Sequence, residues 1–193
     1  MTTDKPDQLT ETRVAEVLRG LAVHVPAGLH DKVFSSWLVA QSRLGEVFVA
    51  FTGNGAQFVR SAESVHGDAA AFAQAYRGRF GRPLQRADRA PAGVLPALRG
   101  RSTGTLLDLS GSSEFERAVL DATRRIPAGQ TRPYAWVARE AGRPRAVRAV
   151  GTVLARNPLP LLVPCHRVVR ADGRLGDYMF GPTHKEELLR AED

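Results

Sequence analysis

Residues 164–169 read Pro164-Cys165-His166-Arg167-Val168-Val169 and contain the only cysteine of the 193-residue chain. An apolar run, Leu159–Val163, comes directly before this stretch. Proline has no N–H group for a central strand ladder, so we predict that a strand ends near Val163 and that the cysteine lies on the turn after it. Successive side chains of an extended strand point to opposite faces, so Cys165 and His166 would meet directly only on such a turn.

The thiol of Cys165 has two interpretations. A single cysteine beside an apolar run is more often a small buried hydrophobe than a reactive group. A thiolate is nevertheless a strong nucleophile, and neighbouring positive charge lowers the pKa of a thiol. His166 and Arg167 could supply that charge, and a water could link the histidine to the thiol if the two side chains diverge. Cys165 is therefore a candidate nucleophile whose role depends on the rest of the chain.

Composition excludes several classes of protein. Hydrophobic content of 43% and charged content of 24% are ordinary for a globular protein. One cysteine excludes an internal disulfide and a multi-cysteine zinc site, and the other histidines are scattered, so we expect no metal and no cofactor. There is no apolar run of about 18 residues and no signal peptide at the polar N-terminus. We expect a cytoplasmic monomer, in a compartment where a thiol stays reduced.

The positive charge of the chain is concentrated in one segment. The net charge is +7, and 24 of the 27 basic residues are arginines. Between Arg124 and Arg156 there are eight arginines and one acid, Glu140, so this segment alone carries a net +7. Clustered positive charge indicates a polyanionic partner, most simply nucleic acid.

The N-terminal half predicts a helical extension followed by a small α/β domain. Residues 1–42 are expected to be helical, because apolar residues recur at helical spacing in Thr12–Leu21 and Lys32–Gln41. Residues 43–110 change to a strand-like pattern. The expected elements are a hairpin of Glu46–Phe51 and Ala56–Val59, a helix Asp68–Tyr76 with Phe72, Ala75 and Tyr76 inward, a loop with a helical turn over Arg82–Arg101, and a strand Thr105–Leu109.

Residues 111–193 predict a mostly helical domain. Ser113 and Glu116 form a capping box that opens a helix reaching Ile126. Two further helices, Tyr134–Ala141 after Pro133 and Arg145–Leu154, are separated by a turn at Gly142, and the second is basic. This is the organisation of a winged-helix-like helix-turn-helix, although any two short helices resemble one. A second capping box, Thr183 and Glu186, is expected to open a final helix with Leu188 and Leu189 inward and Glu192 in its last turn.

The cysteine motif and its surroundings resemble a known family. Pro164–Val168 is similar to the active-site motif of the O6-alkylguanine-DNA alkyltransferases. Residues 113–193 match that family in order and spacing. The other matching positions are Ile126–Thr131, Tyr134, Arg148-Ala149-Val150-Gly151, Asn157-Pro158, Gly176, Tyr178 and the helix containing Lys185, Leu188 and Leu189.

The resemblance implies direct DNA repair. An alkyl group on O6 of guanine, or on O4 of thymine, would be transferred from double-stranded DNA to Cys165. The thioether product has no good leaving group, so each molecule would act once. His166 would act as base through a water, with Glu192 orienting it, as in a catalytic triad. Tyr134 would protonate the leaving guanine.

The resemblance also implies binding roles. The damaged nucleotide would be flipped out of the duplex, with Arg148 filling the gap and Arg145, Ala149 and Gly151 on the same DNA-binding unit in the minor groove. Main-chain carbonyls of Cys165 and Val168 would read the exocyclic amine of the base. Asn157 would hold the turn that carries the thiol, and Tyr178 would lie along the base.

One departure from the family pattern concerns the pocket wall. Met179-Phe180-Gly181-Pro182 stands where family members have Gly- or Ser-rich residues, or Arg-Trp-Gly. Met179 can offer O6 only its backbone N–H as a hydrogen-bond donor. The sequence therefore does not determine which alkyl group the protein prefers. Two other functions remain as alternatives: a non-catalytic protein that binds alkylated DNA, and a cysteine hydrolase unrelated to DNA.

Overall fold

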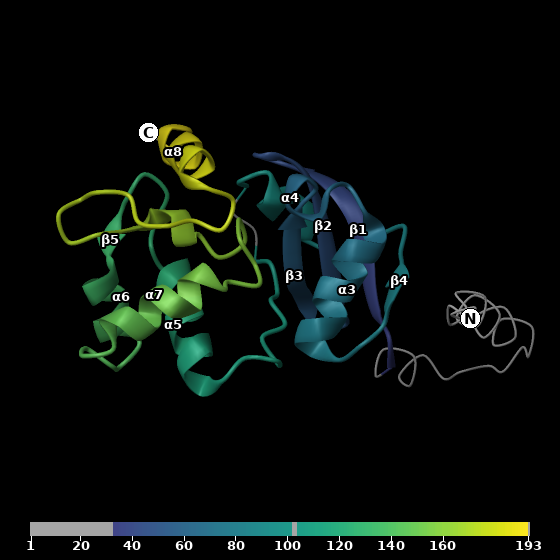
Figure 1. Ribbon diagram of the computed structural model, residues 1–193, viewed down its shortest axis with the longest axis horizontal. Coiled ribbons are helices and arrows are strands. Elements are labelled where there is room, and N and C mark those ends of the chain that lie inside the picture. The colour runs from purple at the N-terminus through teal and green to yellow at the C-terminus, as the bar shows by residue number, and fades with distance from the viewer. Residues whose placement is uncertain (1–32, 102–103, 193) are drawn as a thin grey trace, which may run out of the picture. The chain divides into compact units, whose positions relative to one another are not determined.

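The computed structural model describes residues 33–101 and 104–192 (Figure 1), so the predicted helix Thr12–Leu21 lies outside the described residues. From Phe34 onward the chain forms one compact unit. This unit has two parts: a sheet with its covering helices comes first, and a mostly helical part follows. None of the helices in the described ranges has the length and apolar character needed to cross a membrane.

A four-stranded sheet occupies the first part, with strand order β3-β2-β1-β4. The first three strands are antiparallel neighbours, and β4 runs parallel to β1. The hairpin predicted around Gly53-Asn54 is confirmed, since these two residues connect β2 to β3. The strands are β1 (Ser35–Ser42), β2 (Gly45–Thr52), β3 (Gly55–Ser61) and β4 (Leu84–Arg86).

The central strand β2 is buried on both faces, and its alternate side chains enter two different cores. Phe48 and Ala50 join a cluster with Phe72 and Tyr76 of α3 (Ala69–Phe80). Val47, Val49 and Phe51 point into the larger cluster on the other face. The period-two alternation of a strand explains this division. Asp68 caps α3 by accepting a hydrogen bond from the amide of Ala70.

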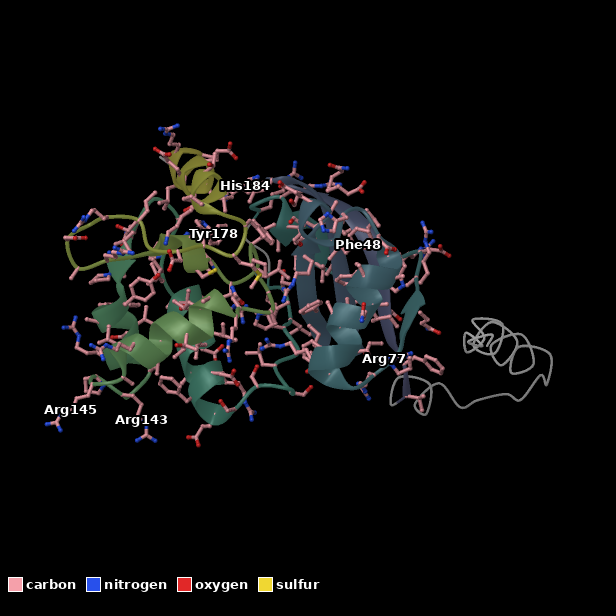
Figure 2. The ribbon with its side chains drawn as sticks, viewed as in Figure 1. Phe48, Arg77, Arg143, Arg145, Tyr178 and His184 are labelled. Atoms are coloured by element: carbon pink, nitrogen blue, oxygen red, sulfur yellow. The ribbon has the colours of Figure 1, made fainter. Side chains whose placement is uncertain are left out.

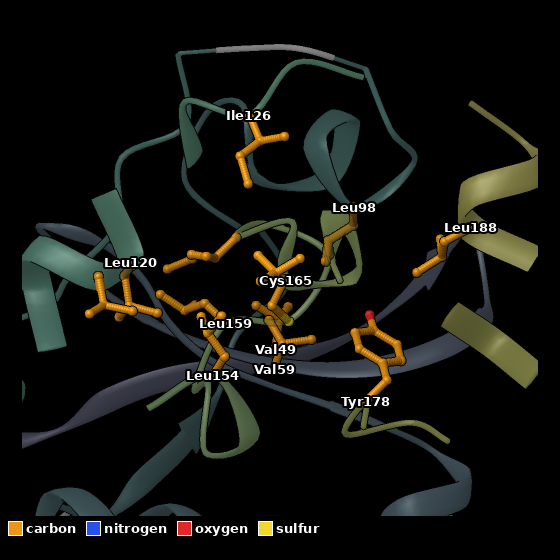
Figure 3. Packing of buried hydrophobic residues seen from close by; sticks show 14 of the residues in the cluster. Val49, Val59, Leu98, Leu120, Ile126, Leu154, Leu159, Cys165, Tyr178 and Leu188 are labelled. Carbon is orange, nitrogen blue, oxygen red and sulfur yellow. The ribbon is translucent and has the colours of Figure 1, made fainter. Parts of the chain in front are cut away.

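The larger cluster joins the sheet to the helical part. Figure 3 shows Val49 and Val59 of the sheet close to Cys165, with Leu120, Leu154 and Leu159 of the helical part in the same cluster. The sheet therefore supports the segment that carries the thiol.

The helical part contains a short parallel pair of strands among its helices. Ser113 accepts from the Glu116 amide and the Glu116 carboxylate accepts from the Ser113 amide, so the predicted capping box is confirmed.

The remaining elements of the two parts, in chain order, are η1 (Glu63–Val65), α4 (Val94–Leu98), α5 (Glu114–Arg124), β5 (Arg132–Pro133), α6 (Tyr134–Glu140), α7 (Val147–Ala155), η2 (Cys165–Arg167), β6 (Val168–Val169) and α8 (Pro182–Arg190).

The prediction of helix up to residue 42 is wrong for Ser35–Ser42, which is strand β1. Trp37 and Val39 pack on the core of α3, whereas Leu38 and Ala40 face the larger core. A strand that is apolar on both faces shows apolar residues at almost every position, so it satisfies a helical stripe as well as a strand pattern. The predicted domain boundary after residue 42 therefore separates strand β1 from the sheet to which it belongs.

Several local predictions differ from the structure. The expected strand Thr105–Leu109 is reduced to a single bridge between Leu107 and Ala56. The short helical turn predicted within Arg82–Arg101 is present as α4, but the same segment also contains strand β4, which was not predicted. Ala75 is exposed on α3.

The predicted capping box at Thr183 and Glu186 is also wrong. Helix α8 begins at Pro182, and its N-cap, Gly181, lies two residues before the predicted cap and has no side-chain cap. Proline favours the first turn of a helix, so the helix starts at Pro182 and not after Thr183. Leu188 is buried as expected, Leu189 is only half-buried, and Glu192 follows the helix.

Candidate active site

Asn157 fixes the turn that leads to the cysteine. It is fully buried, and its Oδ1 accepts a hydrogen bond from the Leu159 amide at 2.9 Å. Its Nδ2 donates to the Val163 carbonyl at 3.3 Å and to Sγ of Cys165 at 3.1 Å. The predicted strand over Leu159–Val163 is absent, because this segment folds back on itself through a bridge between Pro160 and Val163. One amide side chain thus holds both the turn and the thiol.

Cys165 begins the short helix η2 and exposes only 6% of its surface. Burial raises the pKa of the Cys165 thiol, while the hydrogen bond from Asn157 and the charge of Lys185 act in the opposite direction. Desolvation of the thiolate outweighs the positive charge that the sequence places next to the thiol.

His166 is held by a buried carboxylate. Its Nε2 lies 3.0 Å from Oε1 of Glu192, and each side chain is 3% exposed. Arg167 donates to Glu192 through Nε at 2.8 Å and Nη2 at 2.9 Å, and Arg43 donates to Oε1 at 2.9 Å. The histidine and the carboxylate, which are 26 residues apart in the chain, are therefore in direct contact, as the resemblance implies.

The charges of this pair follow from its partners. Burial alone would raise the pKa of Glu192, but hydrogen bonds from His166, Arg167 and Arg43 outweigh it and hold that pKa well below its usual range. Burial lowers the pKa of His166, and Glu192 only partly offsets this effect. A neutral imidazole that donates from Nε2 to a carboxylate keeps its lone pair on Nδ1. This Nδ1 is buried and has no hydrogen-bond partner among the described residues, so it is available as a base.

Lys185 is a buried cation that sequence reasoning did not assign to the site. Its side chain lies on α8 and is fully buried, and Nζ donates to the carbonyls of Val168 at 2.7 Å and Gly176 at 3.3 Å. Burial lowers the pKa of Lys185, and the nearby Cys165 and Asp177 raise it. Its signal in the sequence was its spacing, three residues before the buried Leu188 on the same helix face.

Tyr134 and Tyr178 lie on two sides of the site. Tyr134 starts α6, is half-buried and lines a cleft of about 380 Å³ together with Arg148, Gly151 and Gly176. Burial raises the pKa of Tyr134, so its hydroxyl stays protonated. Tyr178 is buried, its ring lies edge-on to His166 with centroids 6.2 Å apart, and its hydroxyl has no hydrogen-bond partner among the described residues.

The main-chain acceptors of the site already accept hydrogen bonds. The carbonyl of Val168 accepts from Lys185, and the carbonyl of Cys165 accepts from the amide of Val168. Each carbonyl oxygen has a second lone pair, so a role for both in reading a base stays a prediction. Met179 is half-buried beside Phe180, whose ring packs edge-on against Tyr178 at 5.7 Å.

The basic residues of the predicted DNA-binding unit lie on the surface. Arg148 and Ala149 are exposed on α7, and Gly151 is half-buried where the helix borders the cleft. Helix α7 begins at Val147, so Arg145 lies in the turn before it and not within the helix as predicted. Figure 2 shows Arg143 and Arg145 pointing away from the protein at this turn. No group of three or more potential metal-ligating side chains occurs in the described part of the chain.

The fold and the site together define a protein with one acceptor thiol beside a histidine–carboxylate pair. The family model described as 6-O-methylguanine DNA methyltransferase, DNA binding domain, matches residues 114–193. Over residues 114–193 the chain is therefore similar to the O6-alkylguanine-DNA alkyltransferases.

Similar proteins include both curated relatives and solved structures. The chain is 42% identical over 117 residues to the bifunctional transcriptional activator/DNA repair enzyme Ada of Escherichia coli K12, covering 55% of this chain and 33% of that protein. It is 44% identical over 110 residues to a methylated-DNA–protein-cysteine methyltransferase of Mycolicibacterium paratuberculosis, covering 54% of this chain and 66% of that protein.

The structure of Mycobacterium tuberculosis OGT in complex with DNA has a TM-score of 0.65 and 28% identity, covering 81% of this chain and 92% of that chain. The matched region spans between 33% and 66% of the length of the first curated relatives.

Proposed function

We propose that this protein repairs DNA by transferring an alkyl group from O6-alkylguanine to Cys165, once per molecule. The observation that carries the proposal is the thiol held by Asn157 next to a His166–Glu192 pair. A buried neutral thiol, a base with a free lone pair and a fixed carboxylate are the parts that an activated nucleophile needs.

The reaction moves one alkyl group and involves two proton transfers, after which exchange of a proton through solvent returns His166 and Tyr134 to their neutral forms. Sγ of Cys165 forms a bond to the alkyl carbon as the bond from that carbon to O6 of guanine breaks. His166 accepts the thiol proton at Nδ1, directly or through a water, and Glu192 stabilises the resulting imidazolium. Tyr134 gives its proton to the departing guanine, so the base leaves neutral. The thioether that remains has no leaving group, and transfer therefore ends the activity of the molecule.

DNA binding is proposed for the helix-turn-helix formed by α6 and α7, in a winged-helix-like arrangement with β5 and β6. The relative crystallised with DNA supports a duplex as the partner. Arg148 is exposed beside the cleft that Tyr134 lines, so it is suitably placed to fill the gap left by a flipped nucleotide. Residues 111–193 would then act as the alkyl-acceptor domain, in a protein that works as a monomer.

The test is the mass of the peptide that contains Cys165 after incubation with duplex DNA carrying O6-methylguanine. We expect one added methyl group per molecule, with none in Cys165→Ala. An O6-benzylguanine duplex in parallel measures how far Met179 and Phe180 restrict bulky groups. No adduct under saturating lesion DNA would overturn the proposal. Tight binding without an adduct, unchanged in Cys165→Ala, would instead identify a lesion-binding protein.

A further inference from the structure

An arginine of the N-terminal sheet reaches the carboxylate of the active centre. Arg43 lies in the turn between β1 and β2, 149 residues before Glu192 in the chain. Its Nη1 donates to Oε1 of Glu192 at 2.9 Å. The Nε2 atom of His166 contacts the same oxygen at 3.0 Å. The sheet and the catalytic histidine thus share one carboxylate oxygen.

Arg43 is itself fixed from three sides. Its amide donates to the Leu98 carbonyl at 3.2 Å, and its Nη2 lies 3.4 Å from the Leu188 carbonyl. Its side chain crosses Gly100 so closely that a β-carbon there would lie 2.6 Å from Cδ of the arginine. The side chain is 21% exposed. An arginine with a fixed backbone, a fixed stem and two acceptors is held in one position and is not a loose surface charge.

We propose that Arg43 is a positioning residue for the transfer reaction, because it holds Glu192 in the orientation that aligns His166. This inference rests on the proposed function of Cys165. It makes the N-terminal sheet part of the active centre and gives that sheet a role beyond supporting the thiol segment.

Arg43 affects the histidine in two ways. Arg167 binds both oxygens of Glu192, so the carboxylate stays ionised without Arg43, but its orientation then rests on one arginine. The positive charge of Arg43 also lowers the pKa of His166. Removal of this charge raises that pKa, so more of the histidine is protonated, and unable to act as a base, at any given acidic pH.

Other titratable groups surround the same pair. The charged groups lining the cleft of about 310 Å³ that contains His166 and Glu192 are Arg43, Arg101, Arg124, Arg125 and Arg167. The ring of Tyr178 lies edge-on to the imidazole, and the buried Cys165 directly precedes His166 in the chain. Because Arg101 lines this cleft and is exposed, its removal deletes one positive charge there without breaking a hydrogen bond to Glu192.

The experiment measures the single-turnover rate of methyl transfer from an O6-methylguanine duplex between about pH 5 and about pH 9. In Arg43→Met we expect the acid limb of the profile to move to higher pH, which lowers the rate on the acid side. Arg43→Lys keeps the charge and should hold the limb near its wild-type position at a reduced rate. Arg101→Met should follow the wild type.

NMR titration of the His166 ring in the same variants separates positioning from folding. We expect a higher ring pKa in Arg43→Met and not in Arg101→Met, and thermal unfolding identifies variants that have lost structure. If Arg43→Met does not fold, the reduced rate with unchanged limb in Arg43→Lys carries the test. A wild-type limb and rate in Arg43→Met, or equal effects of Arg43→Met and Arg101→Met, would overturn the inference. Absence of transfer by the wild-type protein would instead overturn the proposed function.

Discussion

Cys165 and Glu192 are two buried acids of the candidate site, and their surroundings shift their pKa values in opposite directions. The thiol exposes 6% of the residue surface and has a raised pKa, whereas the carboxylate exposes 3% and has a pKa well below its usual range. The thiol accepts one hydrogen bond from the amide of Asn157. The carboxylate takes part in four hydrogen bonds, to His166, Arg167 and Arg43.

Burial alone therefore does not determine the charge of an acid in this site; the number and charge of the donors determine it. The comparison assigns the two acids different tasks. The carboxylate is charged at neutral pH and can hold the histidine. The thiol stays protonated until a base takes its proton, and a protonated buried thiol reacts slowly with adventitious oxidants. A single-use acceptor benefits from that protection before it meets its lesion.

We expect the largest effect on stability and rate from removing the charge of the Glu192 carboxylate. In Glu192→Gln, Arg43 and Arg167 lose their buried partner, and we expect the free energy of unfolding to fall by about 3 kcal/mol. The imidazolium formed during transfer also loses its stabilising charge, so the rate of methyl transfer should fall about 100-fold. Urea unfolding and single-turnover adduct formation measure the two effects.

The matched control is Glu140→Gln, which removes the carboxylate of an exposed pair with Arg125. Exposed pairs contribute little, so its unfolding free energy should stay within about 0.5 kcal/mol of the wild type. Equal losses in the two variants would mean that the buried carboxylate has no special role in holding the site together.

The second prediction concerns Lys185, the buried cation near the Cys165 thiol. Lys185→Met removes the donor of the Val168 and Gly176 carbonyls, and we expect a loss of about 2 kcal/mol in unfolding free energy. It also removes a positive charge that lowers the thiol pKa, so alkylation of Cys165 by iodoacetamide should slow about threefold at constant pH. Because Cys165 is the only cysteine, the label reports this thiol alone.

Arg190→Met on the same helix is the control, since Arg190 forms an exposed pair with Glu186. Its thiol reactivity should equal that of the wild type. A thiol that reacts at the wild-type rate in Lys185→Met would show that burial and Asn157 alone determine its pKa.

The sequence predicted the features of the fold and of the site that depend on short-range or motif patterns. The capping box at Ser113 and the two-residue turn at Gly53 have short-range signatures, and both are present. The resemblance also paired His166 with Glu192 across 26 residues, and the two side chains are in contact. These successes rest on motifs whose residue types leave few other arrangements.

The rest depends on tertiary contacts that no local pattern contains. Arg43 lies in a turn next to a segment predicted as helix, so nothing in the sequence directs it to a carboxylate near the C-terminus. The strand around Leu38 is apolar on both faces because a core lies on each side, and its pattern alone fits a helix equally well. The sequence left two interpretations of the Cys165 thiol open, because burial is a property of the fold and not of the neighbours in sequence.

The smallest expected effect is on the pH dependence of stability. The pKa of His166 is lowered in the folded protein, so the unfolded chain takes up this proton first as the pH falls below about 6.5. The contribution of His166 is therefore full above that pH, and we expect about 1 kcal/mol to be lost towards about pH 5. The pKa of Glu192 is also lowered, so its contribution is full above about pH 4.3 and is lost as the pH falls further.

Urea unfolding at a series of pH values in the wild type and in Glu192→Gln resolves the two steps. The variant should lack the step below about pH 4.3. Its His166 step should be larger, because Glu192 raises the histidine pKa and glutamine does not. The other histidines and acids contribute equally to both proteins and cancel in the difference. Two profiles that differ only by a constant offset would mean that Glu192 and His166 titrate independently, and the contrast between the two buried acids would then have no effect on the histidine they share.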